Sequence, residues 1–192
     1  MTIPKFHAAM AAVDEAGNNA EAGKNYMWML YALAHSSASY IGAILEIGAG
    51  PDGTSGLTFA YALSEYGGAT PKLFSIDINP EHPVVAVRDF VSEGLKVDWR
   101  IIIGDSLKVS LDQLPDEVDM LYIDGDHGGE HAIGDYRRFS PLVRPGGLIV
   151  FDDYPNGGGV PGAIAELAAE GVVGVALTYN HRDGNSHYVI RK

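Results

Sequence analysis

The sequence predicts a single α/β domain with a mainly parallel sheet of seven strands. Short apolar runs alternate with helical patterns along the chain, and this layout is typical of parallel sheets covered by helices. A chain of 192 residues with 46% apolar content is long enough to bury one core. We therefore expect residues 1–192 to form one domain, with a helical N-terminal segment at 1–40 and the sheet-containing core at 41–192.

Seven short apolar segments are the expected strands. The last two are separated by NHRDGN (residues 180–185), a turn-rich link short enough for a hairpin. The final strand should therefore run antiparallel to its neighbour. The expected strands are residues 43–47, 72–76, 97–103, 118–123, 148–151, 172–178 and 187–190.

Apolar residues at helical spacing predict the helices between these strands. Residues 59–66 show this spacing and are followed by Gly67-Gly68, a good helix stop because glycine accepts the left-handed conformation. The segment after Pro83 and residues 130–139 show similar patterns. A further stripe at residues 26–33 predicts a helix packed on the core, and a lid over a substrate is the alternative interpretation.

Charge and composition limit the classes of partner. The formal net charge is −12 and no Lys/Arg cluster is present, so neither a nucleic acid nor an anionic membrane is an expected partner. The absence of cysteine rules out disulfides and thiolate chemistry. No apolar run approaches the ~20 residues of a membrane span, and the N-terminus lacks a signal-peptide layout. We therefore expect a cytoplasmic protein.

A carboxylate follows or ends each of the first five expected strands. A single acid in this position is usually a turn residue or a helix cap, but the carboxyl ends of parallel strands meet at one edge of a sheet, where α/β domains bind ligands. Five acids at that edge predict a binding site for a cationic or metal-bound ligand. They are Glu46, Asp77, Asp105, Asp124 and Asp152.

The stretch LEIGAGPDG (residues 45–53) matches the Gly-x-Gly-x-x-Gly fingerprint of dinucleotide binding, with Asp77 placed to bind a ribose. NAD is therefore one candidate ligand. However, a pyrophosphate requires free backbone N–H groups and no adjacent anion, whereas this loop contains Glu46 and Asp52. The cationic S-adenosylmethionine (SAM) fits an acid-lined glycine turn better, and the fingerprint alone leaves both ligands open.

Three motifs together resemble the class I SAM-dependent methyltransferases, over about residues 43–151. Residues 45–50 resemble the first motif of that family, residues 75–78 its ribose-binding strand, and residues 104–106 its adenine-contacting turn. The resemblance implies a Rossmann-like three-layer sandwich whose seven-stranded sheet is mostly parallel with an antiparallel last strand. The cofactor-binding residues that it implies are Glu46, Gly48, Gly50, Asp77, Ile78, Asp105, Ser106 and Asp124.

Two later stretches, YIDGDH (residues 122–127) and PGGLIVFDDY (residues 145–154), are similar to the branch that methylates hydroxyl groups with a divalent metal. That branch includes sugar O-methyltransferases and cephalosporin-hydroxylase-like proteins. The resemblance implies that Asp124, Asp152 and Asp153 bind one cation. Oxygen ligands favour Mg²⁺. His127 would then be the general base, although a surface histidine is the alternative, and Asp135 is expected on the surface.

These observations predict a SAM-dependent methyltransferase that acts on the hydroxyl group of a small molecule, with homo-oligomer formation left open. Two alternatives remain. An NAD-dependent oxidoreductase would use the same kind of sheet, but the sequence shows no evident Tyr/Lys proton-donor pair. A module that binds SAM without catalysis would share the first half of the sequence pattern.

Overall fold

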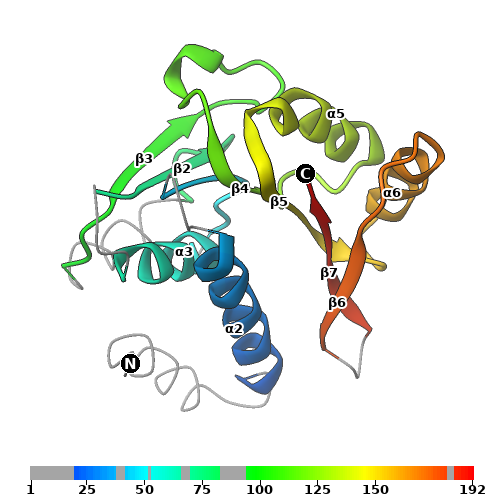
Figure 1. Ribbon diagram of the computed structural model, residues 1–192, viewed down its shortest axis with the longest axis horizontal. Helices are drawn as coiled ribbons and strands as arrows, with labels where there is room; N and C mark the ends of the chain where they lie inside the picture. The colour runs from blue at the N-terminus through cyan, green and yellow to red at the C-terminus, as the bar shows by residue number, and fades with distance from the viewer. Residues whose placement is uncertain (1–19, 38–41, 52, 66–69, 83–93, 181–183) are drawn as a thin grey trace.

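The computed structural model describes residues 20–37, 42–51, 53–65, 70–82, 94–180 and 184–192. They form three layers, in which one seven-stranded sheet lies between the α2–α3 helix pair and the α5–α6 pair (Figure 1). The α/β prediction is therefore confirmed.

The strands are β1 (Ala43–Ile47), β2 (Lys72–Asp77), β3 (Asp98–Ile103), β4 (Val118–Ile123), β5 (Val143–Tyr154), β6 (Val175–Asn180) and β7 (Asn185–Arg191). The helices are α2 (Ala20–Ser37), α3 (Thr54–Ser64), α5 (Gly129–Phe139) and α6 (Val160–Ala169), with short 3₁₀ turns at Leu111–Gln113 and Ser140–Leu142.

The strand order is β3-β2-β1-β4-β5-β7-β6, and β7 pairs antiparallel with both of its neighbours. All the other neighbouring pairs are parallel. The dinucleotide-binding order 3-2-1-4-5-6 contains no strand between the fifth and the sixth. The sheet therefore departs from that order through one reversed strand, whose antiparallel direction the hairpin pattern predicts.

The predicted strands all form, with some shifted ends. Strand β5 is longer at both ends than the predicted 148–151, because the chain stays in the sheet through Pro145-Gly146-Gly147 and past Phe151. Helix α6 was not predicted, although a proline in its first turn and an alanine-rich sequence are helix signals. The predicted helix after Pro83 and the Gly67-Gly68 stop lie outside the described residues.

Two apolar layers cover the faces of the sheet. Helices α2 and α3 pack on one face, where Leu30, Phe59 and Leu63 are fully buried. Helices α5 and α6 pack on the other face through residues such as Phe139 and Leu167. The N-terminal helix α2 therefore contributes to the core. In the part of the chain that the structure describes, no helix combines the length and the apolarity that crossing a bilayer requires.

The strand register brings the predicted acids to one edge. Ile47 of β1 pairs with Ile76 of β2 and with Ile123 of β4, and Ile123 pairs in turn with Phe151 of β5. The next residue along β2, β4 and β5 is in each case an aspartate. The strand register therefore places three aspartates side by side at the carboxyl edge of the sheet.

Candidate active site

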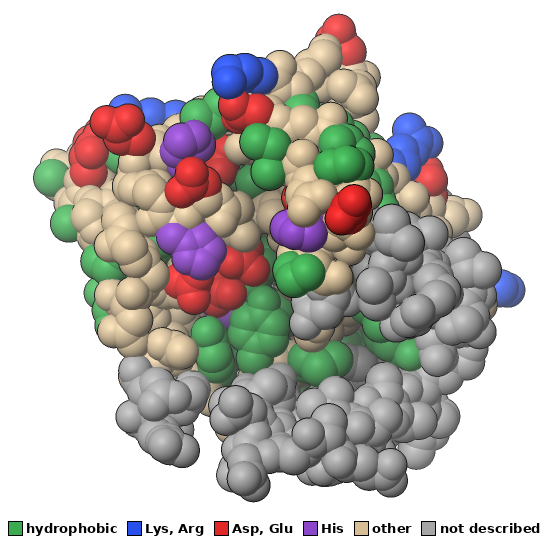
Figure 2. Space-filling model, turned by 180° about the vertical axis from the view of Figure 1, so that it is seen from behind, with side chains coloured by type: hydrophobic (Ala, Val, Ile, Leu, Met, Phe, Trp, Pro, Cys, Tyr) green, Lys and Arg blue, Asp and Glu red, His purple; other side chains and the backbone are tan. Residues whose placement is uncertain are grey.

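A cleft of about 360 Å³ lies at the carboxyl edge of strands β1 to β4. Seven of the eight residues that the sequence assigns to the cofactor line it, and Glu46 is the exception. Seven cleft-lining residues were not assigned to the cofactor from the sequence: Ile47, Ile76, His82, Gly104, Gly125, Asp126 and His131. Acidic and histidine side chains gather around a hollow on the face shown in Figure 2.

The floor of the cleft is a close contact between the first glycine of the loop and strand β4. Gly48 has a φ of 88°, and a Cβ atom at this position would clash with the carbonyl oxygen of Asp124. Its N–H donates to the carbonyl of Ile76 at 2.8 Å. Only glycine satisfies both the left-handed backbone and the close approach.

Asp77, at the end of β2, holds the glycine loop from the side. Its Oδ2 accepts hydrogen bonds from the N–H groups of Ala49 at 3.0 Å and Gly50 at 3.1 Å, and lies 3.2 Å from Nδ1 of His82. Its Oδ1 accepts one from the N–H of Asn79 at 2.8 Å. A carboxylate has about four acceptor positions, so Oδ1 retains one for a ribose hydroxyl.

Glu46 does not reach the cleft. It is 0% exposed and accepts hydrogen bonds from the hydroxyl groups of Ser55 and Ser75, and Ser75 in turn accepts one from Trp99 Nε1 at 2.9 Å. Burial raises the pKa of Glu46 to about 7, although the two serine hydrogen bonds oppose the rise. This buried position does not support the direct contact with the cofactor that the sequence predicts for Glu46.

The third side of the cleft combines an exposed apolar side chain with a polar turn. Ile78 is 73% exposed and offers an apolar surface to a planar ring. Asp105 accepts a hydrogen bond from the N–H of Leu107 at 2.9 Å and pairs with Lys108 at 2.6 Å, and these contacts lower its pKa. The arrangement suits a neutral aromatic ring that packs on Ile78 and donates a hydrogen bond to the Asp105 carboxylate.

The predicted surface position of Asp135 is wrong, because the residue is buried. It lies on α5 and is 1% exposed, and its Oδ1 has no hydrogen-bond partner among the described residues. Burial raises its pKa to about 6. The helical spacing of α5 places Asp135 on the same face as the buried Ala132 and Phe139, so periodicity was the available signal.

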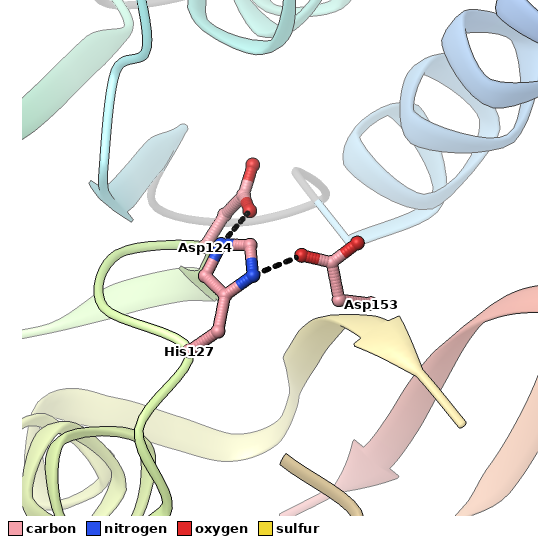
Figure 3. A group of neighbouring side chains, drawn as sticks. All are labelled: Asp124, His127 and Asp153. Carbon is pink, nitrogen blue, oxygen red and sulfur yellow. Dashed lines mark ion pairs between the residues drawn. The ribbon is translucent and has the colours of Figure 1, made fainter. Parts of the chain in front are cut away.

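Next to the cleft, Asp124, His127 and Asp153 converge (Figure 3). Nδ1 of His127 lies 2.7 Å from Asp153 Oδ2, and its Nε2 lies 3.9 Å from Asp124 Oδ1. One possible ligand atom from each residue falls within 4.8 Å of the others. A cavity of about 10 Å³, bordered by these residues and by Asp152, has the size of roughly one water molecule.

Asp153 reaches His127 at a backbone turn within β5, where the pairing register with β7 shifts between Phe151 and Tyr154. Its φ of 57° is the only positive value for a non-glycine residue in the described parts of the chain. Aspartate tolerates this conformation better than most residues, and such outliers concentrate at functional sites. The following loop supports the turn, since Gly159 donates its N–H to the carbonyl of His127 at 2.7 Å and side chains at Gly157 or Gly159 would clash with neighbouring atoms.

Asp152 points to a different partner. Its Oδ1 lies 2.9 Å from Nδ1 of His187, a fully buried residue of β7, and the ring of Tyr179 lies 4.7 Å from the His187 ring, measured between centroids. Burial opposes ionisation of Asp152, but the contacts with His187 outweigh it and lower the pKa. The structure therefore joins Asp124 and Asp153 to His127, and the assignment of Asp152 as a metal ligand stays a prediction.

The electrostatics of the cluster fit a divalent cation. Burial raises the pKa of Asp124, and the nearby charges of Asp152 and Asp153 raise it further. Burial and Asp152 likewise raise the pKa of Asp153. A cation between these groups would remove the repulsion, and the two carboxylates are suitable ligands for a hard divalent metal.

Comparison with known proteins assigns the chain to a protein family. Residues 45–154, more than half of the chain, match the protein family described as Methyltransferase domain. The chain therefore belongs to this family, and it has the Rossmann-like fold of class I SAM-dependent methyltransferases.

Individual relatives agree with this assignment. A protein of Mycobacterium sp. (strain JLS) named "Putative O-methyltransferase" is 33% identical over 129 residues, which cover 66% of this chain and 54% of that protein. The O-methyltransferase TomG from Streptomyces achromogenes, solved with SAM, has a TM-score of 0.67 at 22% identity, covering 86% of this chain and 78% of that chain. An O-methyltransferase from Bacillus cereus, solved with S-adenosylhomocysteine (SAH), has a TM-score of 0.65 at 20% identity, covering 99% and 90%. The chain spans about half the length of the curated relatives it matches.

Proposed function

We propose that this chain transfers the methyl group of SAM to a hydroxyl group of a small molecule with the help of a divalent metal, for which Mg²⁺ is the expected ion. The observation that carries the proposal is that Asp124 belongs both to the cofactor cleft and to the cluster with His127 and Asp153. A methyl donor in the cleft would therefore lie next to a hydroxyl bound at the cluster. The SAM and SAH complexes of the structural neighbours support the choice of cofactor.

Each residue then has a distinct task. Asp77 would accept a ribose hydroxyl, while Ile78 and the turn at Asp105 would bind the adenine. Asp124 and Asp153 would hold the metal, which when bound lowers the pKa of a hydroxyl and orients it. The hydroxyl oxygen would attack the sulfonium methyl in line, so that a C–O bond forms, the C–S bond breaks and SAH leaves.

His127 would take the proton from the hydroxyl. A contact between its Nδ1–H and Asp153 leaves Nε2 with its lone pair, and the side chain is 50% exposed, so a substrate can reach it. This proposal keeps His127 as general base. Its proximity to Asp124 makes metal ligation the competing role, and metal affinity separates the two.

Calorimetry and an activity assay test the proposal together. SAH should bind more tightly than NAD, and SAH release from SAM with a panel of phenolic and sugar hydroxyl acceptors should require Mg²⁺ and stop in chelator. Tighter binding of NAD would refute the cofactor assignment. SAH binding without turnover on any acceptor would instead favour a non-catalytic SAM-binding module, and full turnover in chelator would refute the metal.

A further inference from the structure

We infer that Tyr26 of helix α2 is a positioning residue for the Asp124 carboxylate and acts on it through Tyr122. The hydroxyl oxygens of Tyr26 and Tyr122 are 2.7 Å apart, and the Tyr122 hydroxyl donates to Asp124 Oδ2 at 3.3 Å. This inference rests on the proposed metal site, because Asp124 is one of its two carboxylate ligands. It connects the N-terminal helix to a group that no sequence motif links with it.

The direction of the hydrogen bonds follows from the acceptor at the end. An Asp124 carboxylate that binds a metal is ionised and can only accept, so the Tyr122 hydroxyl donates to it and accepts from Tyr26. The hydrogen bond from Tyr26 restricts the rotation of the Tyr122 hydroxyl and so favours its orientation toward Asp124.

Ring contacts from two strands hold Tyr26 in place, and the ring of Tyr122 has a separate contact. Its ring lies 5.3 Å from the ring of Tyr179 on β6 and 5.3 Å from that of His187 on β7, measured between centroids. The ring of Tyr122 on β4 is packed against Phe59 at 5.2 Å. Because these contacts need only the rings, replacing either tyrosine by phenylalanine removes the hydroxyl and leaves the packing.

The hydrogen bonds from Tyr26 through Tyr122 to Asp124 have a specific consequence for metal binding. When Asp124 is already oriented, less conformational freedom is lost as the metal binds. These hydrogen bonds therefore strengthen metal binding without contacting the ion. Tyr26→Phe and Tyr122→Phe should each weaken metal binding about 3- to 10-fold. The double variant should be no weaker than Tyr122→Phe alone, because Tyr26 has no route to Asp124 without the second hydroxyl.

The test is calorimetric titration of Mn²⁺ and Mg²⁺ into the chelator-treated full chain, with melting temperatures recorded for every variant. Tyr31→Phe is the matched control, because it removes a hydroxyl on the same helix that donates to Glu65 at 2.7 Å, away from the acid cluster. Weaker metal binding in Tyr26→Phe but not in Tyr31→Phe, with the non-additive double variant, supports the inference.

The opposing outcomes are distinct. If the wild type binds metal and Tyr26→Phe binds it equally well, or if the two effects add, the positioning role is wrong and the metal site stands. If the wild type binds neither ion, the inference fails together with the metal part of the proposed function.

Discussion

The buried acid Glu46 provides the most quantitative prediction. Glu46→Gln should stabilise the protein above neutral pH, because the amide has nearly the same shape as the protonated acid and never ionises. The rise in pKa from the ordinary 4.5 to about 7 corresponds to roughly 3 kcal/mol of folding free energy. An imperfect hydrogen bond between the amide and Ser55 or Ser75 would reduce the gain by about 1 kcal/mol.

The sign depends on the proton count of each state. Between pH 4.5 and 7 the unfolded chain has lost this proton while the folded protein retains it, so the wild type loses stability as pH rises through this window. Glu46→Gln has no such loss. The difference in unfolding free energy should therefore be near zero at pH 4.5 and should grow until about pH 8, where the variant is more stable.

Urea unfolding at several pH values measures this difference directly. The exposed acid Glu117 offers a matched control, since Glu117→Gln should leave the pH dependence unchanged. SAH affinity should change by less than about threefold in Glu46→Gln, because Glu46 does not line the cleft. A difference between wild type and variant that does not grow with pH would refute the reasoning.

Further predictions concern the site itself. In chelator, Asp153→Asn should raise the melting temperature because it relieves repulsion between carboxylates, whereas Asp152→Asn should lower it because it removes the charge that faces His187. Titration with Mg²⁺ should show weaker metal binding in Asp153→Asn than in the wild type. His127→Ala should reduce turnover by roughly 10²–10⁴-fold with unchanged metal affinity, and calorimetry showing lost metal binding would make it a ligand instead. Asp77→Ala should weaken SAH binding by about 1.5–3 kcal/mol, and an unchanged affinity would remove the ribose assignment.

Alternation along the strands explains which acids the sequence could place. Asp77 and Asp124 come at the very ends of correctly predicted strands, so their presence at the cleft follows from register. Glu46 lies one position before the end of β1 and pairs with Ser75 and Tyr122 on the neighbouring strands. Its side chain therefore projects from the sheet toward the layer of α2 and α3, where Ser55 contacts it. The alternation of side chains along a strand, with a period of two residues, could have revealed this placement.

The acids of β5 were harder to place, because the strand continues beyond the predicted end at Phe151. Asp152 is still part of the sheet, next to β7, and its partner His187 is distant in sequence. Asp153 also belongs to β5, but its positive φ lies in the irregular part of the pairing with β7, which the sequence pattern does not signal. Neither the position of β7 between β5 and β6 nor the link from Tyr26 to Asp124 has a local sequence signal, because both depend on contacts between distant segments.

The hydrogen bond between Gly159 and the His127 carbonyl has a consequence for redesign. This backbone hydrogen bond links the loop that carries His127 to the segment that follows β5 and Asp153, and it involves no side chain. Side chains around the proposed acceptor site can then be exchanged while this backbone link is kept. Libraries that seek new methyl acceptors should therefore keep residues 157–159 constant and vary the side chains beyond them.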